Sequence, residues 1–152
     1  MKTGEVFDFS HSFVPLEGAV DNKQPSPGEW AMMGGAAVAL LGSFLDVDFE
    51  TSAWGSGMFP IATIIAIYCS VAGILVGLQR FANVNLPTRV AGMTWNQIYL
   101  ALGFFATLMS LFWLFGAEDA GAGLFLILLG SAAVMVGAFI TQQRSADAGS
   151  IG

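Results

Sequence analysis

Four stretches of this 152-residue chain are apolar over a length that suits a membrane crossing, and they contain no acidic or basic side chain. A transmembrane helix needs about 20 apolar residues, at about 1.5 Å each, to cover a hydrocarbon core about 30 Å thick. A soluble helical bundle would instead show a polar face that repeats every three to four residues. The sequence therefore predicts an all-α integral membrane protein with four transmembrane helices, at approximately residues 30–45, 59–78, 95–115 and 121–141.

The segments outside these spans are short. We expect one transmembrane domain at residues 30–141, between an N-terminal tail at 1–29 and a C-terminal tail at 142–152. No continuous apolar core follows Lys2 in the first tail, so we expect the first span to act as the insertion signal. That span is the shortest because Asp46 follows it, and we expect Asp46 to lie at the level of the lipid headgroups.

The basic residues are distributed unevenly among the connecting segments. Lys2 and Lys23 lie in the N-terminal tail, Arg80 and Arg89 lie between the second and third spans, and Arg144 lies in the C-terminal tail. The other two loops carry only acids. Because the Lys and Arg bias of short loops sets orientation, we predict a multi-pass protein of the cell (plasma) membrane with both termini cytoplasmic. These three arginines then serve as topology anchors.

The start of the first span carries a helix-capping pattern. Ser26 and Glu29 have capping-box spacing, and Pro27 stands at the first helical position. Trp30 follows directly, and Trp95 opens the third span. Tryptophan is enriched at membrane interfaces, so we expect both side chains to anchor the helix ends there.

Small residues recur at helical spacing in every span. Lipid is as apolar as leucine, so transmembrane helices associate through close packing at small side chains. We expect one such stripe per helix to form the core of the bundle, leaving bulky side chains such as Phe104, Phe105, Phe112 and Phe115 outward. The expected packing residues are Gly35, Ala39 and Ser43; Ala62, Ala66, Ser70, Gly73 and Gly77; Gly103, Ala106 and Ser110; and Gly130, Ala133 and Gly137.

The spans are expected to form two helical hairpins that resemble one another in sequence. Residues 41–45 (LGSFL) match 108–112 (LMSLF), and the step from Gly73 to Arg80 equals that from Gly137 to Arg144. Either the hairpin has been duplicated in parallel orientation, or leucine-rich helices resemble one another by composition alone. A parallel duplication differs from the inverted repeat of many transporters.

Residues with catalytic or ligand chemistry are sparse. His11 is the single histidine and Cys69 the single cysteine, so the chain offers no pair of axial haem ligands and no zinc cluster. The spans contain no acid or base for a proton relay, and their hydroxyls have no base beside them. Asp46, Asp48 and Glu50 could hold a calcium ion loosely, although a solvated loop is the better interpretation. We therefore expect no catalytic residue, no cofactor, no metal site and no enzymatic activity.

The N-terminal tail is unusually aromatic. Phe7, Phe9 and Phe13 fall within seven positions, which is uncommon in a disordered tail. The acids of this tail argue against tight binding to anionic lipid. Residues 5–14 are interpreted either as a segment that docks on a protein partner or as a plain tether.

Residues 41–45 also support a resemblance. The chain resembles the small four-span membrane proteins of unassigned function that are common in actinobacteria, whose Gly/Ala/Leu-rich first helix runs into a Ser-Phe-Leu end. The resemblance implies the fold, and it assigns no functional residue.

Two functional hypotheses follow. The first is a non-enzymatic accessory or scaffold subunit of a larger membrane assembly, which associates through helix packing and its N-terminal tail. The alternative is a transport component, either an oligomeric pore or a small-substrate carrier. The expected partners are the lipid bilayer and other membrane protein subunits or further copies of the chain, and no nucleic acid.

Overall fold

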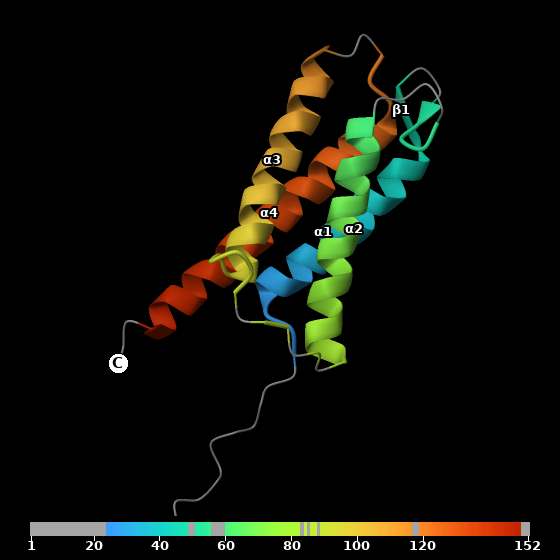
Figure 1. Ribbon diagram of the computed structural model, residues 1–152. Coiled ribbons are helices and arrows are strands. Elements are labelled where there is room, and N and C mark those ends of the chain that lie inside the picture. Colours follow the sequence, from blue (N-terminus) through green and yellow to red (C-terminus); the bar gives the residue numbers. More distant parts are fainter. Residues whose placement is uncertain are drawn as a thin grey trace, which may run out of the picture.

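The described part of the chain folds into four helices and one small β-hairpin. The computed structural model describes residues 24–48, 51–55, 60–82, 84, 86–87, 89–116 and 119–149. Its elements are α1 (Pro27–Phe44), β1 (Asp46–Asp48), β2 (Thr51–Ser52), α2 (Pro60–Phe81), α3 (Trp95–Gly116) and α4 (Ala122–Gly149) (Figure 1).

Three segments of the described chain are helical, long and apolar enough to cross a membrane: Ile61–Phe81, Trp95–Gly116 and Ala122–Asp147. This confirms the predicted helical architecture and the predicted membrane-crossing character of these three helices. Helix α1, with 18 residues, is not among the three.

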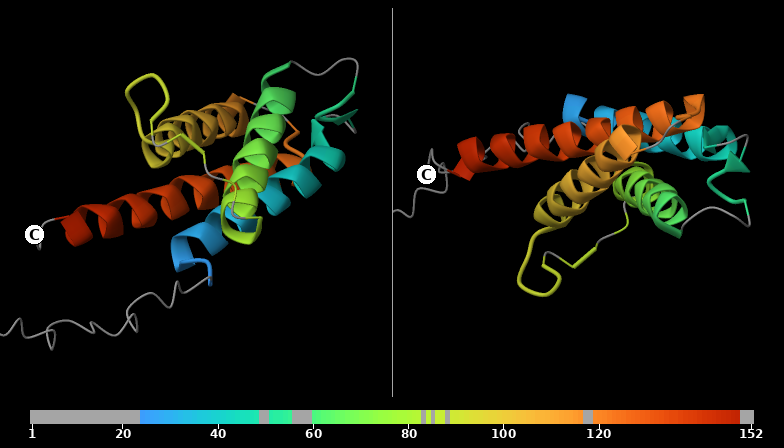
Figure 2. Two further views of the ribbon diagram at one scale, coloured as in Figure 1. Left: turned by 60° about the horizontal axis from the view of Figure 1, so that its bottom comes forward. Right: turned by 90° about the horizontal axis from the view of Figure 1, so that it is seen from above.

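The helices form two layers. Helices α1 and α4 run antiparallel as a close pair, and α2 and α3 pack on the same side of that pair (Figures 1 and 2). Helix α2 contacts mainly α1, helix α3 contacts mainly α4, and α2 and α3 contact each other little. Among the described elements, the most extensive contact is therefore between the first and last helices, which nothing in the sequence indicates.

The start of α1 follows its local sequence. The Ser26 hydroxyl accepts a hydrogen bond from the backbone N–H of Glu29 at 3.3 Å, and the Glu29 carboxylate accepts one from the Ser26 N–H at 2.7 Å. Pro27 occupies the first helical position, where a missing N–H costs nothing. The predicted capping box is confirmed.

Helix α4 is longer than its predicted span. The apolar pattern stops near residue 141, but the helix continues to Gly149. Residues 142–149 contain Gln, Arg and Ala, which favour helix, and no proline. Hydropathy marks where the apolar stretch ends, whereas helix propensity and capping decide where the helix ends, so part of the expected C-terminal tail belongs to α4.

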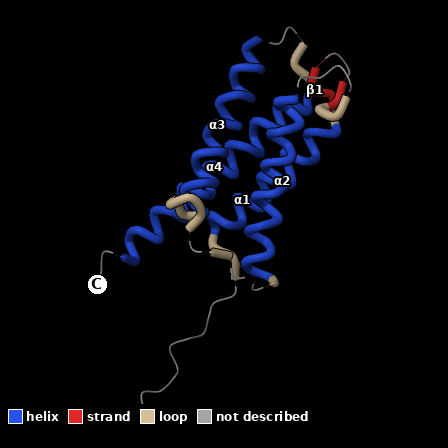
Figure 3. The backbone as a smooth tube through the Cα atoms, in the orientation of Figure 1, coloured by secondary structure: helices blue, strands red, loops and turns tan. Residues whose placement is uncertain are grey.

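The two ends of the bundle differ in structure and charge. One end carries the short antiparallel hairpin of β1 and β2 (Figure 3), and we call it the hairpin end. The other carries the start of α1, the α2–α3 connection and the last turns of α4, and with them Arg80, Arg89 and Arg144. We call it the arginine end.

Candidate functional site

Helices α1 and α4 meet backbone to backbone at three pairs of glycines. The pairs are Gly28 with Gly137, Gly35 with Gly130, and Gly42 with Gly123. A methyl group built on Gly35 would lie 2.6 Å from the Gly130 carbonyl oxygen, and one built on Gly130 would lie 2.5 Å from the Gly35 oxygen. No side chain larger than hydrogen fits these positions without separating the helices.

These six glycines share one spacing. On each helix they recur every seven residues, at 28, 35 and 42 on α1 and at 123, 130 and 137 on α4. Seven residues make almost two helical turns, so the three glycines of each helix lie on one face, which is turned toward the partner helix. Gly35, Gly130 and Gly137 are among the packing residues expected from the sequence, and Gly28, Gly42 and Gly123 are not. The heptad spacing is the signal that would have found them.

The fourteen expected packing residues lie at or near helix contacts. Gly73 meets Ala36 between α2 and α1, and Gly103 meets Met135 between α3 and α4. Ten of the fourteen are buried: Gly35, Ala39, Ser43, Ala62, Ala66, Gly103, Ala106, Ser110, Gly130 and Gly137. Ser70, Gly73, Gly77 and Ala133 are half-buried.

On α2 the side chains at the centre of the buried face are bulkier than expected. Ile65, Cys69 and Val76 lie there with Ala72, and the small-residue stripe runs toward one edge of the face. Ile65 and Cys69 share a buried cluster with Leu124 and Ile127 of α4, and Val76 shares another with Val134 of α4. Bulky side chains of α2 therefore fill the space beside α4.

The hydroxyls inside the helices are satisfied locally. Ser110 donates to the Ala106 carbonyl at 2.8 Å, and Ser131 donates to the Leu128 carbonyl at 3.0 Å, each within its own helix. Ser70, Thr107 and Thr141 make equivalent bonds to the carbonyl four residues earlier. These hydroxyls bond to backbone carbonyls of their own helix, as Ser and Thr side chains inside helices commonly do.

Two helix hydroxyls also bond beyond their own helix. The Thr63 hydroxyl donates to the Ala53 carbonyl, and Ser43 links α1 to the hairpin end. Its hydroxyl donates to the Leu40 carbonyl and accepts a 2.9 Å hydrogen bond from the Trp54 indole N–H. The Trp54 ring stacks on Phe44 with ring centroids 5.9 Å apart. Trp54 thus closes the hairpin onto the end of α1.

The hairpin is also seated on the start of α4. Val47 is fully buried, and its carbonyl accepts a 3.0 Å hydrogen bond from the Gly121 N–H. A methyl group built on Gly121 would collide with the Asp46 carbonyl oxygen. The acidic loop that was expected to be solvated therefore contributes a buried valine and a backbone contact to the fold.

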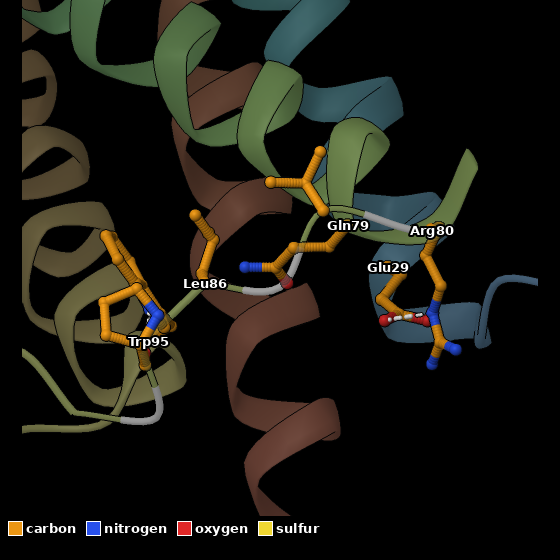
Figure 4. Close-up of a pocket in the computed structure, with 7 residues that line it drawn as sticks. Glu29, Gln79, Arg80, Leu86 and Trp95 are labelled. Atoms are coloured by element: carbon orange, nitrogen blue, oxygen red, sulfur yellow. Dashed lines mark hydrogen bonds and ion pairs between the residues drawn. The ribbon is translucent and has the colours of Figure 1, made fainter. Parts of the chain in front are cut away.

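The arginine end contains an ion pair between α1 and α2. The Arg80 Nε lies 2.7 Å from a Glu29 carboxylate oxygen, and the Glu29 side chain is only 13% exposed. The pair forms one wall of an open pocket of about 350 Å³. Figure 4 shows Gln79 extending from the end of α2 toward Leu86, with Trp95 of α3 on the far side.

Trp95 is held in position at the rim of this pocket. Its indole N–H donates to the Pro87 carbonyl at 2.8 Å, and its ring packs beside Tyr99 with centroids 5.9 Å apart. Trp30, by contrast, is 56% exposed on α1. The two tryptophans expected to be interface anchors thus differ, since Trp95 also fixes the α2–α3 connection.

The ion pair alters the acidity of Glu29. Burial by itself raises the pKa of this carboxyl, but hydrogen bonds from Arg80 and Ser26 and the charge of Arg80 outweigh burial. The pKa therefore lies below its ordinary value of 4.5. Glu29 remains ionised, and the α1–α2 contact at the arginine end remains charged, at neutral pH.

We predict that this contact weakens in acid. A carboxyl whose pKa is lower in the folded than in the unfolded state contributes stability that is complete above the unfolded pKa and is lost as the pH falls through the folded pKa. The Glu29→Gln variant, which keeps the capping geometry, is expected to be less stable than the wild type by about 0.2–1 kcal/mol above about pH 6. The measurement is unfolding of the detergent-solubilised protein across pH.

The difference in unfolding free energy between the wild type and Glu29→Gln should disappear as the pH falls below the ordinary carboxyl pKa of 4.5. Comparing them isolates Glu29 from the other acids, which titrate in both proteins. A gap that stays constant down to the lowest accessible pH would contradict this role of the ion pair.

Helices α2 and α3 leave an apolar cleft between them. Near its middle the cleft is lined by residues such as Ile64, Tyr68, Leu102 and Phe105 and has a volume of about 210 Å³. The Tyr68 hydroxyl donates to the Tyr99 carbonyl at 3.0 Å and links the two helices toward the arginine end.

The outer face of α3 is rich in exposed phenylalanine. Phe104, Phe105, Phe112 and Phe115 are 58%, 54%, 68% and 82% exposed, whereas Ser110 on the opposite face is fully buried. The outward placement expected from the sequence is observed. No other described helix exposes as many phenylalanines.

The described part of the chain brings no three His, Cys, Asp or Glu side chains together in a metal-binding group. Phe7, Phe9 and Phe13, in the expected docking segment at 5–14, lie outside the described residues. The site that the geometry builds is therefore one of packing surfaces and of a charged pocket at the arginine end.

Comparison with protein-family models, with curated proteins and with solved structures finds no match to this chain.

Proposed function

We propose that this protein is a non-enzymatic accessory or scaffold subunit of a larger membrane assembly. The observation that carries the proposal is the outer face of α3, which exposes four phenylalanines while its small residues pack on α4. Aromatic side chains are enriched in protein interfaces, where large rigid rings supply much of the contact. A helix attached to its own bundle along one narrow face is well placed to bind a second protein along the other.

The proposal includes α1 as a fourth membrane-spanning helix, with the chain arranged as two hairpins. The glycine pairs between α1 and α4 extend from Gly28 near the start of α1 to Gly42 near its end. Helix α1 is about 27 Å long at about 1.5 Å per residue, close to the thickness of the hydrocarbon core. Because α1 lies in backbone contact with α4 over this length, α1 crosses the membrane where α4 does.

We place both termini and the arginine end on the cytoplasmic side of the cell membrane. Arg80, Arg89 and Arg144 gather at this end, while Asp46 and Asp119 lie at the hairpin end. The positive-inside bias of short loops supports this orientation. In this arrangement the hairpin end faces the exterior.

The test compares partner retention by two matched variants. Phe104→Ala/Phe115→Ala removes two exposed rings of α3 that do not line the α2–α3 cleft, and Ile67→Ala/Ile74→Ala removes two α2 side chains that are 48% and 61% exposed and also lie outside it. Truncating an aromatic anchor costs about 1–2 kcal/mol, so the α3 variant should lose on the order of tenfold or more in retention of unlike subunits. The wild type and the α2 variant should retain them. The measurement is native mass after purification in mild detergent.

Unlike subunits that stay bound to the α3 variant as firmly as to the wild type would contradict the proposal. A homo-oligomer of the wild type that conducts ions in a planar bilayer would instead favour the transport component, as an oligomeric pore.

A further inference from the structure

The pocket at the arginine end lies where the N-terminal tail joins the bundle. Glu29, which lines the pocket, is three residues after Ser26, the N-cap of α1. The remaining lining is contributed by the end of α2, the α2–α3 connection and the start of α3: Gln79, Arg80, Val84, Leu86, Pro87 and Trp95. The chain therefore enters α1 beside this pocket.

We propose that the pocket binds residues 5–14 of this same chain. The occupant would be an acidic, phenylalanine-rich segment, and the contact would tie the tail to the α2–α3 connection. This inference does not depend on the proposed function, since it concerns the isolated protein.

The length of the connecting chain permits this contact. Eleven residues lie between position 14 and position 26. A flexible chain of that length has a root-mean-square span of about 20 Å and reaches about 40 Å when extended. Tethering at this distance gives an effective concentration on the order of millimolar, so a contact of modest intrinsic affinity is largely occupied.

The chemistry of the two surfaces is complementary. One wall of the pocket is apolar, with Val84, Leu86 and the ring of Trp95, and suits the phenylalanines at 7, 9 and 13. The segment at 5–14 carries two acids and no Lys or Arg, whereas the segment at 79–94 carries two arginines and no acid. The apolar contact supplies burial, and the opposite charges align the segment with the pocket.

The position of Glu29 argues against an anionic lipid headgroup as the occupant. Its carboxylate already binds the Arg80 Nε from within the pocket wall, and it would repel a phosphate placed directly beside it. Phenylalanine side chains can cover the apolar wall without approaching this carboxylate. The acids of the tail can pair with the exposed Arg89 along the α2–α3 connection.

Disulfide trapping in the full-length, detergent-solubilised protein tests the proposal. Phe9→Cys is combined with Val84→Cys in the pocket or, as a matched control, with Ser145→Cys on the last turns of α4. Val84 and Ser145 are both exposed, and Thr141, one turn before Ser145, lies against Gly28. Both positions are therefore close to the start of α1, but only Val84 lines the pocket.

After mild oxidation, the 9–84 disulfide should form within one chain in yield on the order of tenfold above the 9–145 disulfide, the preference given by about 1.4 kcal/mol of docking free energy. Adding Glu5→Lys/Asp8→Lys should reduce that preference severalfold. The parent protein, with the buried Cys69 alone, sets the background. Leu86→Cys is a second pocket reporter that should behave as Val84→Cys does.

Equal yields at positions 84 and 145 would overturn the proposal, as would disulfides that form only between chains. A 9–84 yield unaffected by the two lysine substitutions but suppressed by vesicles of anionic phospholipid would assign the pocket to lipid headgroups and would also overturn it. The experiment contains no other protein, so its failure is separate from a failure to retain partner subunits.

Discussion

Replacing Gly35 by alanine is expected to destabilise the helical bundle, whereas replacing the adjacent Gly34 by alanine is expected to stabilise it slightly. A methyl group at Gly35 would lie 2.6 Å from the Gly130 carbonyl oxygen and 2.8 Å from the Ala133 Cβ. A methyl group at Gly34 would meet nothing within 4 Å. The first change forces two helix backbones apart, so we expect a loss of about 1–3 kcal/mol.

The change at Gly34 affects the helix alone. Alanine favours helix over glycine by about 0.5–1 kcal/mol, so the expected effect at Gly34 has the opposite sign. Unfolding of both variants in mixed detergent micelles, followed by circular dichroism, gives the comparison. Equal effects of the two substitutions would show that α1 and α4 are not in backbone contact.

The second large effect is expected at the hairpin end. A methyl group at Gly121 would collide with the Asp46 carbonyl oxygen, while one at Gly116 would meet nothing within 4 Å. A backbone carbonyl cannot rotate away as a side chain can, so Gly121→Ala should separate the hairpin from α4. This separation should break the hydrogen bond from the backbone N–H of residue 121 to the Val47 carbonyl. Val47 would then lose its buried site, and the total loss should be about 2–4 kcal/mol.

Protease digestion distinguishes local release of the hairpin from general unfolding. In Gly121→Ala, cleavage within residues 46–55 should become faster by tenfold or more, since local opening is easier by at least about 1.4 kcal/mol. Gly116→Ala should be cleaved as the wild type is. Cleavage of Gly121→Ala that begins inside the helices instead would show that the hairpin does not depend on this contact.

Much of the fold was predictable from hydropathy and local capping rules. The apolar stretches locate the helices because backbone N–H and C=O groups in hydrocarbon must bond within the segment. The cap at Ser26 was predictable because its residues are neighbours in sequence, and Glu29 accepts the expected hydrogen bond. The end of α4 at Gly149 was not predictable in this way, because outside the apolar stretch hydropathy no longer indicates whether the chain is helical.

The packing residues were only partly predictable. A small side chain permits two helices to approach closely, but it does not specify which helix is the partner, since every span carries a stripe of small residues. Gly73 packs on α1 and Gly103 packs on α4, and nothing local to either glycine specifies this. The ion pair of Glu29 with Arg80 joins residues that are 51 positions apart, and it depends on where α2 ends relative to α1.

The sequence by itself determined that the chain is helical, where its apolar helices lie, and that small residues mark their contact faces. These properties follow from interactions within one helix or between the chain and its solvent. Only the tertiary structure decided that α1 pairs with α4, that Val47 of the hairpin is buried, and that Glu29 meets Arg80 beside a pocket. Each of these requires two distant segments to match in register, and the heptad glycines of α1 and α4 match because their backbones can touch at all three levels.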